Sequence, residues 1–190
     1  MSRLIRILTV SLLLITARPL LAADTVQVRM QTNVGDIVLE LDREKAPITV
    51  KNFLDYAESG FYEGTIFHRV IGNFMIQGGG YDEKFNKKQT RPAIRNEAPN
   101  GLKNLRGTIA MARTGVIHSA TAQFFINVKD NPNLDYKNPS PRGFGYAVFG
   151  KVVEGMQTVD RIRKSRTGSG GRFRTDVPTP IIIINKVSVE

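Results

Sequence analysis

The 190-residue sequence predicts a mainly β domain, a barrel or a sandwich, that also carries two α-helices. Short runs rich in β-branched and aromatic residues recur along most of the chain, and two other segments place apolar residues at helical spacing. The polar and glycine-rich stretches between these runs are typical of turns and loops. Apolar residues make up 41% of the chain and no long polar or proline-rich tract marks disorder, so one domain is expected.

Residues 1–23 are expected to be a secretory signal peptide, which leaves residues 24–190 as the folded domain. Basic residues open the chain, an apolar run follows at 7–15, and small residues end the segment at Ala23. The apolar run is shorter than the roughly 20 residues that a membrane-spanning helix needs, so we expect no membrane span. Leu21 stands where a small residue is preferred, so the cleavage site is predicted only to within one residue.

The composition limits the chemistry that the chain can perform. It has no cysteine, which excludes disulfides and thiol catalysis, and its two histidines, His68 and His118, are too few for a zinc site without carboxylate ligands. Ser119 follows His118, but no GxSxG elbow is present, so a hydrolase triad is not expected. Removing the three arginines of the signal peptide lowers the formal charge from +10 to +7, and charge alone names no partner.

The folded part opens with a predicted hairpin and a helix. Residues 26–32 and 36–41 alternate apolar and polar side chains on either side of a glycine, which indicates two antiparallel strands. Pro47 then begins a helix with Thr49 as its candidate cap, and four apolar residues follow at i, i+3, i+4 and i+7 before Gly60 ends it. This helix is expected to pack on the sheet.

The remaining apolar runs are short and strand-like. They are TIFHRVI at 65–71, FMIQG at 74–78, GTIAMA at 107–112, AQFFINV at 122–128, YAVFGKV at 146–152 and PIIIINKVSV at 180–189. Residues 80–106 are expected to form a long polar loop, and loops of this length in compact domains are usually functional. A second helix is predicted at 154–164, followed at 165–179 by a glycine-rich basic loop.

Residues 67–80, FHRVIGNFMIQGGG, set one arginine, Arg69, among apolar side chains and end in three glycines. An arginine on a strand is by default a surface residue and its apolar neighbours are by default core, so spacing alone does not decide whether this is a site. His68 should face away from Arg69, since neighbours in a strand alternate, and is interpreted as a hydrogen-bonded structural residue. The glycines lack the GK[ST] of a phosphate-binding loop and are better explained by close backbone approach to a peptide or a tight strand exit.

Four blocks, FHRVIGNFMIQGGG, GTIAMAR, AQFFINV and YAVFGKV, resemble the cyclophilin family of peptidyl-prolyl cis/trans isomerases, in the family's order along the chain. The resemblance covers residues 26–189 and implies a closed eight-stranded antiparallel β-barrel capped by two α-helices. It also implies an enzyme that needs no cofactor and no metal. Together with the signal peptide, it makes the chain most similar to the periplasmic cyclophilins of Gram-negative bacteria, so we expect a periplasmic folding helper that acts on proline-containing polypeptides. Family members are often monomeric, and a monomer is expected here.

Arg69 is the candidate catalytic residue, for a reason that lies in the amide bond. Rotation about an X-Pro bond breaks amide conjugation, at a barrier of roughly 18 to 20 kcal/mol. Twisting frees the lone pair of the prolyl nitrogen, so a donor aimed at that nitrogen binds the transition state better than either planar ground state. The guanidinium of Arg69 stays charged and holds its donors in a fixed plane, which a lysine would not do.

The resemblance assigns the other parts of the site. The proline pocket would be lined by Phe74, Met75, Phe125 and Leu134, with Tyr146 on its wall. Gln77 would hold the orientation of Arg69, and Gln123 would bind the substrate backbone. Ala112 and Arg113 would present backbone groups to the peptide. From spacing alone Phe74, Met75 and Phe125 would be assigned to the core, and only the resemblance favours the pocket.

Four features depart from the familiar eukaryotic pattern. Asn133 stands where those proteins have a tryptophan, Tyr146 where they have a histidine, and Arg113 where they have an asparagine, while residues 137–144 lengthen the loop before Tyr146. Several bacterial relatives also carry tyrosine in place of the histidine, so catalysis is expected to survive. The missing indole removes a large flat surface and a donor, so weak binding of cyclosporin is predicted.

Two other functions stay open at this point. A module that binds proline-containing segments with little catalysis would explain the changes at Asn133 and Tyr146. A binder of anionic surfaces or nucleic acid would use the basic residues that cluster between 161 and 174, although a solvated face is the ordinary explanation of such a cluster. Nucleic acid is not expected as a partner of an exported protein.

Overall fold

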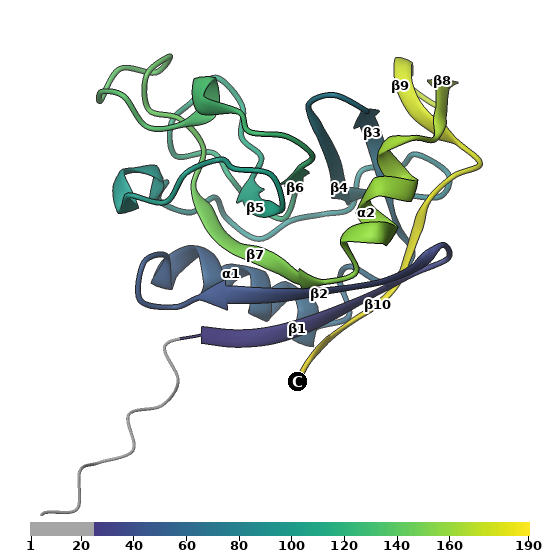
Figure 1. Ribbon diagram of the computed structural model, residues 1–190, viewed down its shortest axis with the longest axis horizontal. Helices are drawn as coiled ribbons and strands as arrows, with labels where there is room; N and C mark the ends of the chain where they lie inside the picture. The colour runs from purple at the N-terminus through teal and green to yellow at the C-terminus, as the bar shows by residue number, and fades with distance from the viewer. Residues whose placement is uncertain (1–24) are drawn as a thin grey trace, which may run out of the picture.

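The computed structural model describes residues 25–190 (Figure 1), and the expected signal peptide at 1–23 lies outside the described residues. The strands are β1 Thr25–Thr32, β2 Gly35–Asp42, β3 Thr65–Ile71, β4 Met75–Asp82, β5 Thr108–Met111, β6 Phe124–Asn127, β7 Val148–Glu154, β8 Arg166–Gly170, β9 Phe173–Thr179 and β10 Ile183–Val189. The helices are α1 Pro47–Glu58 and α2 Met156–Arg163, with short 3₁₀ turns at Ala98–Asn100 and Pro132–Leu134. No helix of this part of the chain is long and apolar enough to cross a membrane.

Eight strands close into an antiparallel barrel in the order β1, β10, β3, β4, β6, β5, β7, β2. Closure pairs every strand on both sides, which removes the exposed edges of an open sheet. Helix α1 lies against β10 and β2, and α2 lies against β2, β3 and β4. The predicted fold, a closed eight-stranded antiparallel β-barrel capped by two α-helices, is confirmed.

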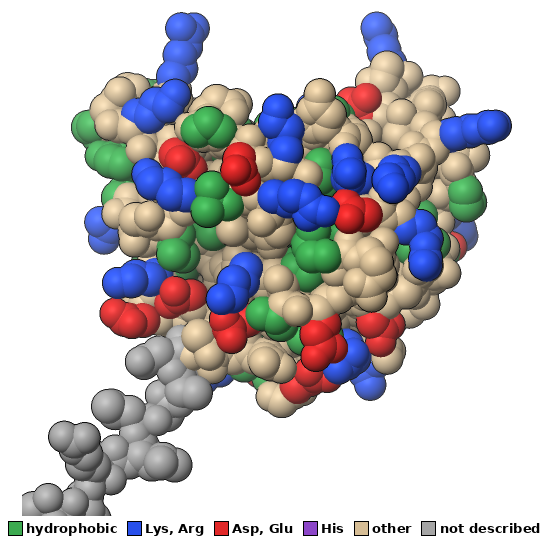
Figure 2. All heavy atoms as spheres, in the orientation of Figure 1, with side chains coloured by type: hydrophobic (Ala, Val, Ile, Leu, Met, Phe, Trp, Pro, Cys, Tyr) green, Lys and Arg blue, Asp and Glu red, His purple; other side chains and the backbone are tan. Residues whose placement is uncertain are grey.

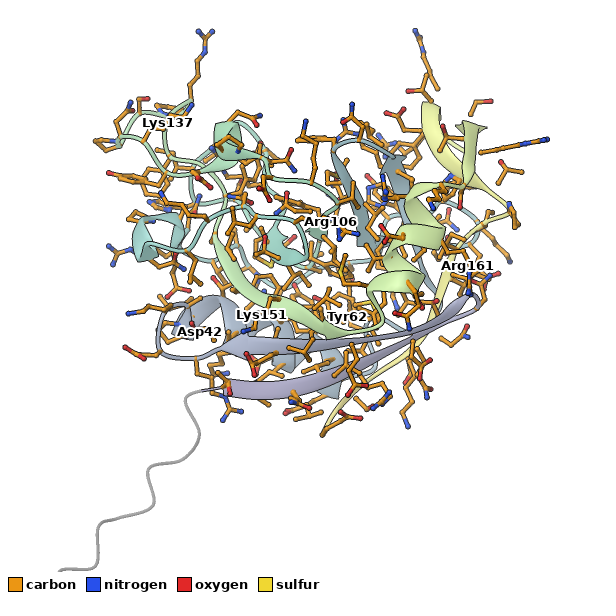
Figure 3. The ribbon with its side chains drawn as sticks, in the orientation of Figure 1. Asp42, Tyr62, Arg106, Lys137, Lys151 and Arg161 are labelled. Atoms are coloured by element: carbon orange, nitrogen blue, oxygen red, sulfur yellow. The ribbon has the colours of Figure 1, made fainter. Side chains whose placement is uncertain are left out.

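Strand alternation fills the interior of the barrel. In β1, Val26, Val28 and Met30 are buried while the residues between them face out. Aromatic rings continue this core under α1: the ring of Phe53 lies 5.0 Å from that of Tyr62, which points into the interior (Figure 3). The core therefore occupies the inside of the barrel and the end that α1 covers.

The start of α1 differs from the prediction. Ala46, not Thr49, precedes the helix, and the N-terminal backbone is capped by Glu97, 48 residues further along the chain than Thr49. The carboxylate of Glu97 accepts hydrogen bonds from the backbone N–H of Ile48 and Thr49, at 3.1 and 2.8 Å, and from the Thr49 hydroxyl at 2.7 Å. A cap supplied from so far along the chain leaves no mark in the local sequence.

The segment at 165–179 is also corrected, because it forms the two-stranded hairpin β8–β9 and not a loop. Figure 1 shows this hairpin beyond α2, beside β3. Phe173 and Val177 anchor it, since Val177 is buried and the Phe173 ring packs on Tyr81 at 5.0 Å. The glycines and arginines around these two residues hid the strand pattern.

The three glycines that close FHRVIGNFMIQGGG lie inside β4, which continues to Asp82. Gly79 has φ +78°, and a Cβ atom there would lie 2.8 Å from the Phe124 ring and 2.9 Å from the Tyr62 ring. The predicted close approach of the backbone is therefore present at Gly79, where the neighbours are aromatic rings of the core.

Candidate functional site

Nine of the ten predicted site residues line one pocket, a cavity of about 120 Å³. They are Arg69, Phe74, Met75, Gln77, Ala112, Arg113, Phe125, Leu134 and Tyr146. The cavity is smaller than the roughly 300 to 1,000 Å³ of sites for drug-sized ligands, so it suits a single small side chain. Gln123 is outside the lining and lies next to Gln77.

Strand register brings these residues together on the outer face of the barrel wall. Arg69 of β3 is the cross-strand partner of Gln77 on β4, and Gln77 is the partner of Phe125 on β6. Phe125 alternates with Phe124 and Ile126, which belong to the barrel interior. The row Arg69, Gln77, Phe125 therefore faces outward, away from the packed core.

The floor of the pocket is apolar and separate from the barrel core. Met75, Phe125 and Leu134 are buried in a second cluster, against which Phe74 and Tyr146 pack. The Tyr146 ring meets the Phe125 ring edge-on, with centroids 5.6 Å apart. This surface offers apolar contact to a ring and no charge.

Arg69 stands at the edge of this floor with its side chain 42% exposed. Its Nε lies 3.6 Å from Oδ2 of Asp176, a residue of β9. Gln77 lies beside Arg69 in the ladder, but its amide donates to Oε1 of Gln123 at 3.0 Å, and no hydrogen bond joins it to Arg69 in the described part of the chain. The contact that we expected to steady Arg69 is thus replaced here by the carboxylate of Asp176.

Arg113 stabilises the wall of the pocket that contains Tyr146. Its guanidinium lies over the Tyr146 ring, 4.9 Å from the centroid. It donates to three backbone carbonyls: Nε to Gly145 at 2.9 Å, Nη1 to Thr114 at 2.9 Å and Nη2 to Pro141 at 3.0 Å. Because Pro141 and Gly145 belong to the lengthened loop, Arg113 ties that loop to the pocket.

The two histidines take no part in this pocket. His68 is buried, and its ring packs at a tilt against the rings of Tyr81 and Phe173. Burial lowers its pKa from 6.5 to about 4. A backbone hydrogen bond with Ile66 opposes this shift, and the charge of Arg69 adds to it. The expectation of a structural residue agrees with this, although its Nδ1 has no hydrogen-bond partner among residues 25–190.

His118 is likewise structural. Its Nδ1 accepts a hydrogen bond from the backbone N–H of Asn96 at 3.1 Å, while the Ser119 hydroxyl donates to the carbonyl of Val116 at 2.7 Å. The pair therefore forms no triad. Within the described residues, no three His, Cys, Asp or Glu side chains are grouped so as to hold a metal ion.

Sequence reasoning missed Asp176 and Phe173, which approach the site from the β8–β9 hairpin. Asp176 is the one acidic residue between positions 165 and 179, and Phe173 is the one aromatic residue there. A single aromatic residue among arginines and glycines could have indicated that this segment packs on the domain. A single carboxylate could have indicated that it pairs with an arginine.

Comparison with known proteins identifies the family and agrees with the fold. The family model described as cyclophilin type peptidyl-prolyl cis-trans isomerase/CLD matches residues 27–189. The chain is 56% identical over 162 residues to peptidyl-prolyl cis-trans isomerase B of Escherichia coli, covering 85% of this chain and 98% of the relative. It is 52% identical over 185 residues to isomerase A of Dickeya dadantii, covering 96% of each.

A solved structure gives the same result. The crystal structure of a cyclophilin type isomerase from Cryptosporidium parvum has a TM-score of 0.71 at 29% identity, covering 87% of this chain and 98% of its own. The family that the four sequence blocks suggested is thus confirmed. The chain belongs to the cyclophilin-type peptidyl-prolyl cis-trans isomerases, and it is an enzyme of that class.

Proposed function

We propose that this isomerase accelerates X-Pro rotation by a non-covalent mechanism in which Arg69 donates a hydrogen bond to the prolyl nitrogen. In the planar amide the nitrogen lone pair is delocalised and is a poor acceptor, whereas in the twisted amide it is free. A donor at that position stabilises the transition state selectively, which raises kcat and not merely affinity. The observation that supports this proposal most directly is that Arg69 lies at the edge of the apolar floor of the pocket.

The pocket supplies the binding part of this proposal. The proline ring rests on Phe74, Met75, Phe125 and Leu134, whose buried surfaces favour an apolar group. Backbone groups of Ala112 and Arg113, with the side chain of Gln123, contact the peptide on either side. Proline-containing polypeptides as substrates are supported by the Cryptosporidium parvum structure solved in the presence of the dipeptide Ala-Pro, which has a TM-score of 0.70 to this chain.

The proposed setting is the periplasm, where the enzyme assists the folding of exported proteins. The support is the N-terminal sequence of residues 1–23, with its basic start, apolar run and small residues before Asp24. Expression of the full chain in a Gram-negative host, followed by mass spectrometry of the periplasmic fraction, tests this. A mature protein that begins at or within one residue of Asp24 is expected, and an uncleaved chain retained in the cytoplasm would overturn the proposal.

The mechanism is tested by a proline-limited refolding assay with the Arg69→Ala variant. The expected result is a loss of about 100-fold or more in kcat/KM, the size typical of removing one preorganised transition-state donor. Arg29→Ala is the control, since Arg29 also lies on a barrel strand, is 33% exposed and pairs with carboxylates, Glu190 at 2.6 Å and Asp36 at 3.6 Å, but is outside the pocket. Full activity of Arg69→Ala would refute the mechanism.

A further inference from the structure

The β8–β9 hairpin is fixed to the strands that carry the site. The Phe173 ring of β9 lies 5.2 Å from the ring of His68 on β3 and 5.0 Å from that of Tyr81 on β4. Val177, near the other end of β9, is buried. The hairpin is thus anchored at two points, and the residues between them have defined positions beside β3.

Asp176 lies between these anchors with an unusual backbone. Its φ is +70°, in the left-handed region that residues other than glycine rarely adopt. The ladder is irregular at the same place: Gly168 pairs with Val177 but Gly170 pairs with Phe173, so three residues of β9 face one of β8. Bulges of this kind redirect a side chain and are common beside active sites.

The redirected side chain faces the candidate catalytic arginine. Asp176 Oδ2 lies 3.6 Å from Arg69 Nε, and the two side chains are 34% and 42% exposed. Among residues 25–190 no other carboxylate pairs with Arg69, and the amide of Gln77 is engaged with Gln123. An ion pair through Nε restrains the guanidinium while its Nη hydrogens stay available to a prolyl nitrogen.

We propose that Asp176 is a positioning residue for Arg69, held in place by the strained bulge of the β8–β9 hairpin. The inference rests on the proposed function, since it assumes that Arg69 is the donor. An exposed ion pair contributes little to stability. Its effect here is on the orientation of the guanidinium, and therefore on kcat, while the apolar floor that binds the proline ring is unchanged.

The test compares Asp176→Asn with the wild type by steady-state kinetics on an Ala-Pro peptide. Asparagine has nearly the same shape and tolerates positive φ, so the variant removes the charge and keeps the backbone. We expect kcat to fall about three- to tenfold with KM little changed. This range corresponds to losing from the transition state the free energy of an exposed ion pair, or of one slightly stronger. Asp176→Glu should recover part of the loss, because it restores the charge.

Two comparisons separate positioning from general damage. Asp36→Asn removes the same charge from the other ion pair that is 3.6 Å long, Arg29–Asp36, and should leave kcat unchanged. Combined with Arg69→Ala, Asp176→Asn should have no further effect, since it acts through Arg69. The NMR signals of the His68 ring, which stacks on Phe173, report whether the hairpin is still docked.

Should Asp176→Asn displace the hairpin, Asp176→Gly is the second variant, since glycine adopts positive φ without strain. Wild-type kcat in a docked variant, or an equal loss in the Arg69→Ala background, would overturn the proposal. These results differ from a failure of the proposed function, in which Arg69→Ala itself keeps full activity.

Discussion

At the scale of single residues, the position of each side chain in the alternation of a strand decides its role. Phe124 and Phe125 are neighbours of similar burial, yet one packs in the barrel core and the other in the pocket floor. His68 and Arg69 do not divide in this way, although strand alternation predicted that they would face apart. The β3–β4 register shifts between Phe67 and Arg69, and both side chains contact β9, His68 through Phe173 and Arg69 through Asp176. The site is therefore one face of strands whose other face stabilises the barrel.

The buried ring of His68 predicts a pH-dependent stability. Because burial lowers the pKa from 6.5 to about 4, the unfolded chain binds a proton between these pH values that the folded chain does not. The free energy of unfolding should fall as the pH falls through this window, by at most about 3 kcal/mol. Asp55, Asp82 and Asp160 have pKa values lowered from 3.8, so their stabilising effect is lost only below the window.

Urea unfolding at about pH 7 and about pH 4.5 measures this effect. His68→Phe should remove most of the pH dependence, whereas the control His118→Asn should keep it. Equal unfolding free energies of the wild-type protein at the two pH values would contradict the buried, neutral state of His68.

Asn133 predicts how the site responds to cyclosporin. It is exposed beside Leu134, and it offers neither the flat surface nor the donor of the tryptophan found there in eukaryotic relatives. Asn133→Trp should increase cyclosporin affinity by about tenfold or more, as expected for adding an aromatic anchor at an interface. Isothermal titration calorimetry measures the change, with Asn185→Trp, on β10, as the control. Nanomolar affinity of the wild-type protein would show that the indole is not needed.

At the scale of elements, β4 contributes both to the pocket on the outside of the barrel and to the packing of the core inside it. It contributes Met75 and Gln77 to the pocket, and its glycines let the wall pass close to the core rings. The hairpin β8–β9 adds a second layer outside the barrel next to β3. Pocket and hairpin are therefore coupled to the core through the same pair of strands.

Gly79 is predicted to be intolerant of any side chain. Alanine there would combine positive φ with contacts under 3.0 Å to two aromatic rings, so Gly79→Ala should lower the free energy of unfolding by about 2 kcal/mol or more. Gly115 is the matched control, because a Cβ atom there meets open space, and Gly115→Ala should change stability by no more than about 0.5 kcal/mol. Equal effects of the two substitutions in urea unfolding would refute the packing argument.

Elements whose pattern is local were predictable from the sequence. The alternation of 26–32 and the spacing after Pro47 gave the first hairpin and α1, and the blocks around Arg69 gave the pocket residues through their resemblance to a family. What failed depends on distant partners: Glu97 caps α1 from another loop, and the hairpin at 165–179 is stabilised by Phe173 packing on rings of β3 and β4. No periodic pattern in the neighbouring sequence predicts either contact.

At the scale of the whole molecule, basic side chains are spread over the visible face among acidic and apolar ones (Figure 2). Part of the basic cluster at 161–174 is engaged in the structure: Arg161 donates to the carbonyl of Val34, and Arg163 donates to Asp160 at 2.7 Å and to the carbonyl of Gly72 at 3.0 Å. The bonds to Val34 and Gly72 tie α2 to the barrel, whereas the bond from Arg163 to Asp160 lies within α2. They favour a structural role for Arg161 and Arg163 over a binding surface.

The distribution of apolar surface predicts a monomer. The exposed large apolar residues of the described chain are Ile48, Leu105, Val116, Val153 and Val189. They are few and come from five separate segments of the described chain, whereas a stable dimer interface needs a continuous apolar patch. Sedimentation equilibrium of the protein from Asp24 onward should give the mass of one chain at all concentrations, and a concentration-dependent dimer would contradict this.

The central claim is that Arg69 recognises the twisted amide and not the planar peptide. Exchange spectroscopy on a short Ala-Pro peptide tests it directly, because chemical shift changes report binding and exchange peaks report cis/trans rotation. The account predicts that Arg69→Ala still shifts the peptide signals, since the apolar floor is intact, but no longer accelerates exchange. Exchange as fast as with the wild-type protein, or a loss of binding that accounts for the whole loss of exchange, would contradict it.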